Sequence, residues 1–293
     1  MLTVLAPAKI NLTLEVLAKR RDGFHEIRSV IQTINLCDSL RFHLSQNIEF
    51  KCDLLNWISE KSLVSKATDL LREVTGCTKG ATIEINKRIP LLSGLGGDSS
   101  DAAAILRGLN KLWGLSLSPG ELLELAARLG SDVAFFLYGG TALVKGRGEV
   151  VTPLPPLPHM WVVVMIPPVT QLPGKTERLY TSLNSSHYTD GQVTERLVEE
   201  LQEGREFTPS LLFNAFENVA FARSSQISVY REHFVKVGAT DIHLAGSGPA
   251  LFTLVKDKTQ AEEIYQRLQQ QELETYLVGT LAGIKQINNS CNE

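Results

Sequence analysis

The chain has 293 residues, of which 43% are hydrophobic and 21% are charged, so it can bury a sizeable core and is not a disordered protein. The net charge is −3, so the sequence shows no excess of positive charge of the kind that binds nucleic acid or an anionic membrane surface. The sequence contains no run of about 18 apolar residues that would predict a membrane span. It also lacks the basic start and clean apolar core of a signal peptide. We therefore expect a cytoplasmic chain of one or two domains, with no nucleic-acid, membrane or obligate protein partner.

The cysteines are Cys37, Cys52, Cys77 and Cys291. None of them belongs to a C-x-x-C motif, which disfavours a zinc site. Scattered cysteines in a cytosolic chain are ordinarily reduced thiols, and we expect the same here.

Alternating polarity predicts the first strand. Apolar residues stand at every second position of 10–16, with polar residues between them. This period of two is typical of a strand with one buried face. Lys9 and Asn11 then project from the same face, about 7 Å apart.

Further strands and one helix are predicted before residue 90. An Asp-Gly turn signal at residues 22–23 separates the first strand from the next. The patterns that follow predict strands over 29–36, 39–44 and 81–90 and a helix over 62–75.

Helices are predicted in the section after residue 100. An apolar face predicts a helix over 102–113. Ser118 and Glu121 form a capping box at the start of the next helix. A short third helix begins with Ser131 or Asp132 at its cap.

The second half of the chain predicts an α+β unit. Residues 141–154 have the pattern of a hairpin, and the four prolines that follow within 153–158 mark a domain boundary, which gives domains 1–155 and 156–293. Beyond the prolines we expect a strand over 161–166, two helices within 191–236, two strands joined by a glycine turn over 240–255, a helix over 259–271 and a last strand over 275–283.

The sequence PLLSGLGGDSS occupies residues 90–100, between a predicted strand and a predicted helix. Such a loop presents N–H groups and the positive end of the helix dipole to a phosphate. The sequence fits neither G-x-G-x-x-G nor the Walker pattern, but its glycines and paired serines exceed what a structural turn needs. We predict a phosphate-binding loop made of Pro90, Leu91, Leu92, Ser93, Gly94, Leu95, Gly96, Gly97, Asp98, Ser99 and Ser100.

Asp98 places an anion inside this predicted anion-binding loop. In the leading hypothesis its carboxylate points out of the cradle and accepts hydrogen bonds from N–H groups of the loop or a helix start. In the alternative it contacts Mg²⁺ directly or through water.

The triplet Gly174-Lys175-Thr176 is a second candidate for a phosphate loop. Walker spacing requires glycine where Val169 stands, and the triplet lies among prolines without a glycine-rich approach. We therefore disfavour a Walker loop there.

Lys9 and Asp132 each allow two interpretations. A lysine on a strand face usually points to solvent, but in a partly dry cleft it can stabilise the charge that develops in phosphoryl transfer. An aspartate at a helix start is a good N-cap, but its carboxylate can also accept a hydroxyl proton in a kinase.

Two further features allow both a structural and a functional interpretation. His25 beside Phe24 is either an ordinary surface pair or a pair that stacks on and hydrogen-bonds a nucleobase. The glycine turn in LAGSGPALF, at residues 244–252, is either a strand bend or a wall of an active site.

Five segments together identify a resemblance to a known family. They are APAKINLTLEV, RRDGFHEIRS, PLLSGLGGDSSDAAAILRGLN, LGSDVAFFLYGGTALVKGRGE and LAGSGPALF. In this order they resemble the GHMP kinases, and more closely the members that phosphorylate 4-diphosphocytidyl-2-C-methyl-D-erythritol in the non-mevalonate isoprenoid pathway. The resemblance implies an α+β fold of two domains, a β-rich α/β domain with the phosphate loop and a C-terminal ferredoxin-like domain.

The resemblance also implies a reaction and its residues. ATP would donate its γ-phosphoryl group to the 2-hydroxyl of the erythritol moiety, with Mg²⁺ as cofactor and no metal ligand assigned. Lys9 matches the active-site lysine of the family, and Asp132 matches the aspartate proposed as base. The positions that line the substrate pocket match Asn11, Phe24, His25 and, more loosely, Tyr180.

Departures from the family pattern affect loop geometry and fine substrate contacts rather than the reaction class. Leu92 and Ser93 stand where relatives have more glycine, Ala134 replaces a common proline, and Phe24 replaces a common tyrosine. Two alternatives stay open at this point, namely a GHMP kinase for another small alcohol such as mevalonate or homoserine and a ligand-sensing relative without catalysis.

Overall fold

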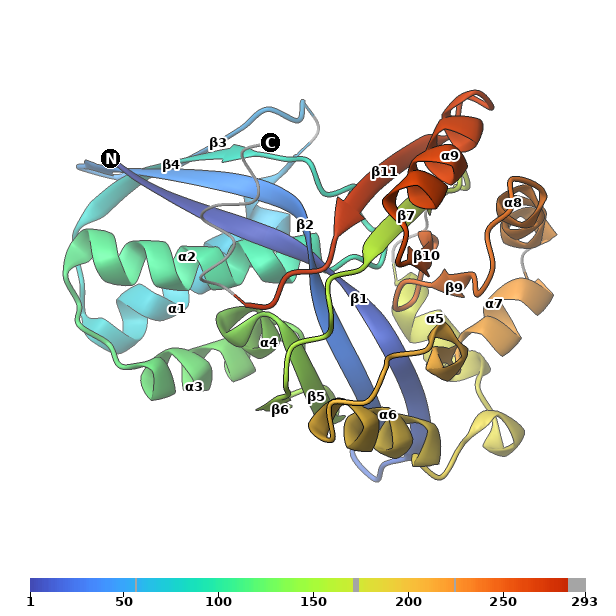
Figure 1. Ribbon diagram of the computed structural model, residues 1–293. Helices are drawn as coiled ribbons and strands as arrows, with labels where there is room; N and C mark the ends of the chain where they lie inside the picture. The colour runs from blue at the N-terminus through green and yellow to red at the C-terminus, as the bar shows by residue number, and fades with distance from the viewer. Residues whose placement is uncertain (56, 171–173, 224, 284–293) are drawn as a thin grey trace.

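The computed structural model describes residues 1–55, 57–170, 174–223 and 225–283 (Figure 1). In these residues the strands form two sheets. The larger sheet has seven strands in the order β3-β4-β2-β1-β8, with β5 paired to β2 and β6 paired to β5. Its strands are β1 Leu2–Lys19, β2 His25–Ser45, β3 Ile48–Cys52, β4 Gly80–Asn86, β5 Thr141–Gly146, β6 Val150–Pro153 and β8 Phe213–Asn214.

The smaller sheet lies beside the upper part of β1 and β2 in Figure 1. It has four strands in the order β11-β7-β10-β9, and all of its pairs are antiparallel. Its strands are β7 Trp161–Ile166, β9 His243–Leu244, β10 Leu251–Val255 and β11 Glu274–Gly279.

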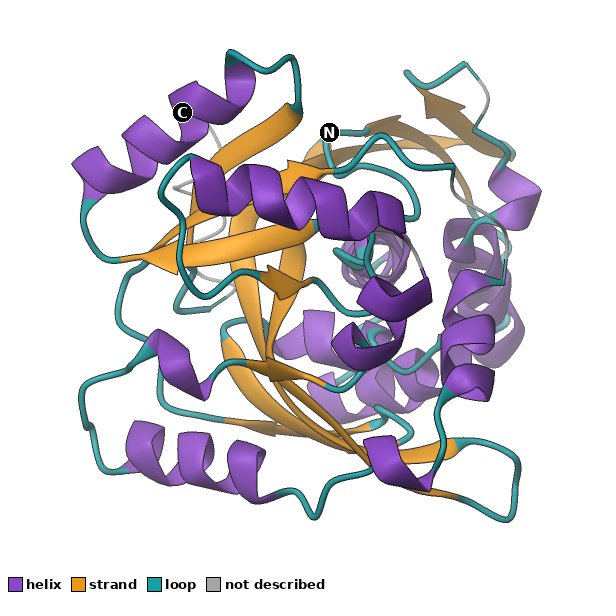
Figure 2. Cartoon of the chain, turned by 90° about the vertical axis from the view of Figure 1, so that its right-hand side faces the viewer, coloured by secondary structure: helices purple, strands orange, loops and turns teal. Residues whose placement is uncertain are grey.

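Helices surround the strands, which run through the middle of the molecule (Figure 2). Helices α1 to α4 lie together on one side of β1 and β2, and α5 to α9 lie toward the other side (Figure 1). The helices are η1 Ser59–Lys61, α1 Leu63–Thr75, α2 Gly97–Trp113, α3 Pro119–Leu129, α4 Val133–Tyr138, α5 Lys175–Ser182, η2 Ser185–His187, α6 Gln192–Gln202, η3 Pro209–Leu211, α7 Glu217–Arg223, α8 Ser225–Lys236 and α9 Lys258–Gln269.

Strands β1 and β2 form one long antiparallel hairpin. The predicted turn is confirmed, because Arg20 N–H donates to Phe24 O at 2.8 Å and the Asp22 carboxylate accepts from Phe24 N–H at 3.1 Å. The two strands expected over 29–36 and 39–44 are instead one strand, β2. A register shift between Pro7 and Ala8 of β1 marks an irregularity that lets the pairing continue across this region.

The two faces of β1 have different neighbours. Ala8, Ile10 and Leu12 are fully buried in a cluster that also contains Val162 and Phe252 of the smaller sheet. The side chains between them, which begin with Lys9, are the polar ones. The predicted alternation is therefore present, and the strand is buried on both faces because a second sheet covers its apolar side.

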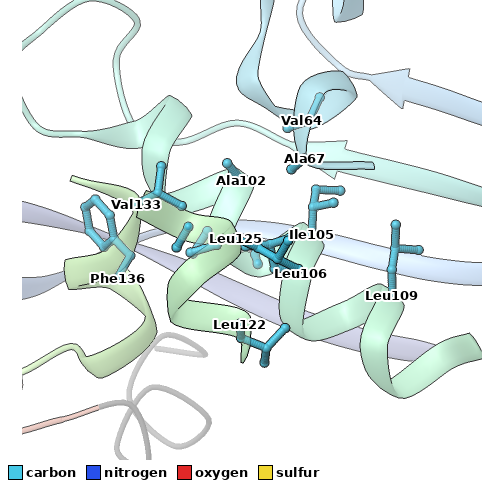
Figure 3. Close-up of a cluster of buried hydrophobic side chains, with 14 of the residues drawn as sticks. Val64, Ala67, Ala102, Ile105, Leu106, Leu109, Leu122, Leu125, Val133 and Phe136 are labelled. Atoms are coloured by element: carbon cyan, nitrogen blue, oxygen red, sulfur yellow. The ribbon is translucent and has the colours of Figure 1, made fainter. Parts of the chain in front are cut away.

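Helices α1 to α4 share a core with the larger sheet. Side chains from all four helices meet there, including Ala67, Ile105, Leu122 and Phe136 (Figure 3). The predicted caps are present. Gly114 ends α2 in the left-handed conformation at φ 67°, and the box of Ser118 and Glu121 starts α3.

Several expectations on the elements are wrong in detail. β4 ends at Asn86, so the predicted strand over 81–90 is too long. The range 191–236 holds three α-helices, the short helix η3 and the short strand β8 rather than two helices, and α5 and β3 lie where no element was expected. The sequence patterns of these segments are short or only weakly periodic, so tertiary packing determines their secondary structure.

The expectation of reduced thiols is confirmed for two of the cysteines and wrong for a third. Cys52 and Cys77 are free, as expected. Cys37 is disulfide-bonded, so the expectation of a reduced thiol is wrong there. Cys291 lies outside the described residues.

In the part of the chain that the structure describes, none of the helices has the length and apolar character needed to cross a membrane.

Gly108 lies where α2 approaches β2 so closely that a side chain would collide with the sheet. A Cβ atom at this position would lie 2.4 Å from the ring of Phe42. Gly108→Ala will therefore lower the free energy of unfolding by about 1–3 kcal/mol through overpacking, although alanine favours a helix by about 1 kcal/mol. Urea denaturation with a fixed m value measures this change.

Gly120→Ala is the matched control, because the nearest atom to a Cβ there is 3.9 Å away. We expect it to be neutral or stabilising. Equal stabilisation by both substitutions would contradict the close packing of α2 on Phe42.

Candidate active site

A cavity of about 960 Å³ lies where the larger sheet, the glycine-rich loop and α5 meet. This volume is at the upper end of the range for small-molecule sites. Many of the predicted site residues line it, namely Lys9, Asn11, Phe24, His25, Leu92, Gly94, Gly96, Ser99, Asp132 and Tyr180.

Lys9 is buried on the polar face of β1, so the solvent-facing interpretation is wrong. Its Nζ donates to Asn11 Oδ1 at 2.7 Å and lies 3.8 Å from Asp132 Oδ2. Ser29 Oγ accepts from the Asn11 amide at 2.9 Å, which orients that amide toward Lys9. Burial lowers the pKa of the Lys9 ammonium, and Asp132 partly opposes this shift.

Asp132 occupies the N-cap position of α4, but its carboxylate makes no capping hydrogen bond. The side chain is about one-third exposed, at 35%, and points to Lys9. The capping interpretation is therefore wrong for the side chain, which leaves its oxygens available to a ligand in the cavity.

The glycine-rich loop joins β4 to α2 in a conformation that only glycine tolerates well. Gly94 and Gly96 have φ values of 91° and 79°. A Cβ on Gly94 would lie 2.1 Å from Ala245 O, and one on Gly96 would lie 2.9 Å from the ring of Phe136. The loop is thus held between the core and the turn that follows β9.

The start of α2 is open to a ligand. Its N-cap residue is Gly96, and no side chain caps this helix start in the structure. The first N–H groups of a helix have no intrahelical partner, and they carry the positive end of the helix dipole. Ser100 Oγ is buried here with no hydrogen-bond partner among the described residues.

The predicted loop residues do not all face the cavity. Leu92, Gly94, Gly96 and Ser99 line it. The others are outside the set of lining residues, namely Pro90, Leu91, Ser93, Leu95, Gly97, Asp98 and Ser100. Ser93 instead holds the loop together, because its hydroxyl donates to Pro90 O at 2.7 Å.

Asp98 caps a different helix. Its carboxylate accepts from Leu63 N–H at 3.1 and 3.2 Å and from the Ser62 hydroxyl. It therefore points away from the cradle to the start of α1, in agreement with the leading hypothesis. The N–H groups it satisfies belong to a helix 35 residues earlier in the chain.

An aromatic wall forms the other end of the cavity. The His25 ring stacks on the Tyr180 ring with the two centroids 4.9 Å apart. The Tyr188 ring meets the His25 ring edge-on, with the centroids 6.0 Å apart. Burial and the charge of Lys19 lower the pKa of His25, which favours the neutral ring near neutral pH. Phe24 is half-exposed at the rim, where the Arg147 guanidinium lies 4.8 Å from its ring centroid.

A buried ion cluster underlies the glycine-rich loop. Lys87 Nζ contacts Asp38 and lies 2.6 Å from Asp101 Oδ2. Burial and the neighbouring carboxylate of Asp38 raise the pKa of Asp101 well above its ordinary value, although Lys87 opposes this. Asp38 also accepts from Ile89 N–H at 2.8 Å, so the cluster anchors the strand end that leads into the loop.

Sequence reasoning missed several residues of the cavity. Lys175 and Thr176 line it, although the sequence analysis disfavoured a Walker loop at this triplet, and Thr176 Oγ1 lies 2.9 Å from Ser247 Oγ. Gly246 and Ser247 place the AGSGP turn in the wall, as one of its two interpretations expected. The triplet Gly174-Lys175-Thr176 stands out in the sequence, but without Walker spacing it gave no reason to place this lysine in the site.

Two family models and several known proteins are similar to this chain. The family model "GHMP kinases N terminal domain" matches residues 62–140, and the model "GHMP kinases C terminal" matches residues 194–274. A Dehalococcoides mccartyi protein named 4-diphosphocytidyl-2-C-methyl-D-erythritol kinase is 50% identical over 96% of this chain and 99% of its own. A Geobacillus thermodenitrificans protein of the same name is 39% identical over 91% of this chain and 92% of its own.

Solved structures are similar as well. A crystal structure of 4-(cytidine 5'-diphospho)-2C-methyl-D-erythritol kinase superposes with a TM-score of 0.81 and 30% identity, covering 95% of this chain and 99% of that chain. The L. major mevalonate kinase, at a TM-score of 0.71 and 18% identity over 96% of both chains, shares the fold.

Asp98→Ala will leave the Leu63 N–H at the start of α1 without its acceptor, while Ser62 still caps Val64 N–H at 3.3 Å, and it will lower the free energy of unfolding by about 1 kcal/mol. Asp69→Ala is a matched control, because Asp69 is an exposed carboxylate within the same helix. We expect it to leave stability unchanged or raise it slightly. Chemical denaturation of both variants measures the difference, and equal stabilities would refute the capping role of Asp98.

Proposed function

The chain belongs to the GHMP kinase family, and from this premise we propose how it phosphorylates its substrate. It is an ATP-dependent small-molecule kinase with the two-domain GHMP-kinase fold. Its substrate is 4-diphosphocytidyl-2-C-methyl-D-erythritol, whose 2-hydroxyl receives the γ-phosphoryl group in isoprenoid precursor biosynthesis. The observation that carries this conclusion is a cavity that joins an uncapped helix start, a buried lysine with its partly exposed aspartate partner, and an aromatic wall.

The ATP phosphates are proposed to lie along the loop 90–100. The open start of α2 supplies N–H donors and the positive end of a helix dipole, which together favour an anion. Gly94 and Gly96 bring the backbone close without a side chain in the way. Asp98 does not oppose this binding, since its carboxylate is engaged at the start of α1.

Asp132 and Lys9 are proposed to act on the acceptor hydroxyl. Asp132 would accept the proton of the 2-hydroxyl while that oxygen attacks the γ-phosphorus and ADP leaves. Lys9, 3.8 Å from the carboxylate, would stabilise the charge that develops on the oxygen. Asn11 holds the ammonium in place through its 2.7 Å hydrogen bond.

The cytidine moiety is proposed to occupy the aromatic end. His25 and Tyr180 supply a stacked pair with a hydrogen-bonding ring nitrogen, which suits a flat base. Phe24 would contribute its ring but no hydroxyl, and its partner Arg147 adds a positive charge at the rim.

Mg²⁺ is proposed as the cofactor. No group of three His, Cys, Asp or Glu residues suited to a metal occurs in the described ranges, but magnesium at kinase sites takes most of its ligands from water and phosphates. Ser99 and Asp132 line the cavity and would offer a hydroxyl and a carboxylate oxygen to such an ion. When bound, the ion would neutralise charge on the phosphates.

Three further expectations are also proposals. We propose that the two domains divide between residues 155 and 156. Strand β8 of the second domain nevertheless pairs with β1 of the first domain. A cytoplasmic location and the absence of an obligate protein partner stay predictions.

A phosphotransfer assay with radiolabelled ATP tests the proposed substrate. We expect phosphorylation of 4-diphosphocytidyl-2-C-methyl-D-erythritol and none of mevalonate or homoserine, because the aromatic end suits a nucleobase. Activity with mevalonate alone would overturn the assignment. Tight ATP binding without any turnover would favour the ligand-sensing alternative.

Asp132→Ala will lower kcat by about a hundredfold or more, since general-base catalysis contributes about that factor. The fold should persist, because the carboxylate makes no capping hydrogen bond. Glu177→Ala is the control, as it removes another carboxylate that lines the same cavity. Stability loss with retained kcat would show that Asp132 only supports α4, and an equal kcat loss in Glu177→Ala would point to a general effect of charge.

A further inference from the structure

Lys175, the first residue of α5, is a half-buried cation in the wall of the cavity. Its Nζ donates to the backbone carbonyl of Gly248 and, at 3.4 Å, to that of Leu92. These carbonyls belong to the two glycine turns that meet at the phosphate end. The ammonium forms no salt bridge with a carboxylate among the described residues, and burial alone lowers its pKa to about 8.

The other cations of the cavity are engaged or exposed. Lys9 contacts Asn11 and Asp132. Arg147 covers the Phe24 ring and lies 3.8 Å from a carboxylate oxygen of Glu149. Lys19 is exposed. Among the described residues, Lys175 is thus the half-buried positive charge of this wall that has no carboxylate partner, and such a charge is stabilised when an anion binds beside it.

The position of Lys175 along α5 indicates which anion this is. Tyr180 lies five residues later, which is about 7.5 Å along a helix axis, and it stacks on His25 at the proposed cytidine end. One helix therefore supplies both the aromatic ring and the cation to the cavity. The N–H donors proposed for ATP come from α2, a different helix from the one that carries Lys175.

We propose that Lys175 is a ligand of the substrate diphosphate. It leaves its two carbonyl partners, or shares them, when the diphosphate of the cytidylyl substrate enters, and it gives the site preference for a nucleoside diphosphate over the bare nucleoside. This inference rests on the proposed function, because the occupant of the aromatic end is taken to be cytidine.

Calorimetric titration of the full chain with cytidine and with CDP tests the proposal. Saturating non-hydrolysable ATP analogue keeps CDP out of the ATP position. The quantity measured is the ratio of the Kd for cytidine to the Kd for CDP. Lys175→Met should lower this ratio about tenfold or more, the scale of a charge-assisted hydrogen bond, and leave the Kd for cytidine within about twofold.

Three variants control the measurement. Lys175→Arg retains the charge and should restore most of the ratio. Lys175→Gln is a second neutral variant in case the methionine variant is unstable. Lys145→Met removes an exposed positive charge from β5 outside the cavity and should leave the ratio unchanged.

The possible results distinguish a failure of this inference from a failure of the proposed function. An unchanged ratio in Lys175→Met overturns the inference while the proposed function stands. If Lys175→Met weakens the binding of cytidine and of CDP equally, Lys175 has a structural role. If it weakens only the binding of the ATP analogue, Lys175 is a ligand of ATP. Each of these results also refutes the inference. Failure of the wild-type chain to bind CDP at all would refute the proposed function itself.

Discussion

The burial of one ammonium group constrains the whole site. Lys9 lies on a strand that is covered on both faces, so its charge is held away from water and requires polar partners. Asn11 provides one on the same strand and Asp132 provides the other from the start of α4. A shift of β1 by one residue would exchange its two faces. The register of the central hairpin therefore positions the groups proposed to react.

Features that depend on neighbouring residues could be predicted from the sequence. The alternation of β1, the Asp-Gly turn and the capping box of Ser118 each follow from local chemistry, and the structure contains all three. The glycine-rich loop belongs to the same group, because positive φ values at Gly94 and Gly96 require residues without a side chain. The resemblance added Tyr180, which lines the same cavity as Lys9 and Asp132.

Contacts between distant segments could not be predicted in this way. Nothing near Asp98 indicates that its carboxylate caps a helix beginning at Leu63, because that contact exists only once α1 and α2 pack together. Lys175 stands among prolines and shows no periodic pattern, yet it enters the cavity through the placement of α5. The sequence predicts two strands where the structure has the single strand β2, because β2 continues as one strand across the register shift opposite Pro7 and Ala8.

The pairing of β8 with β1 has a consequence for the order in which the protein can be assembled during synthesis. β1 leaves the ribosome first, but its parallel neighbour is Phe213–Asn214, and its apolar face is covered by β7 and β10. The growing chain must therefore keep Ile10 and Leu12 from aggregating until most of the polypeptide has been made. Only then can the strand that carries Lys9 acquire its final neighbours, so a nascent chain that stops before residue 213 cannot yet possess the complete sheet.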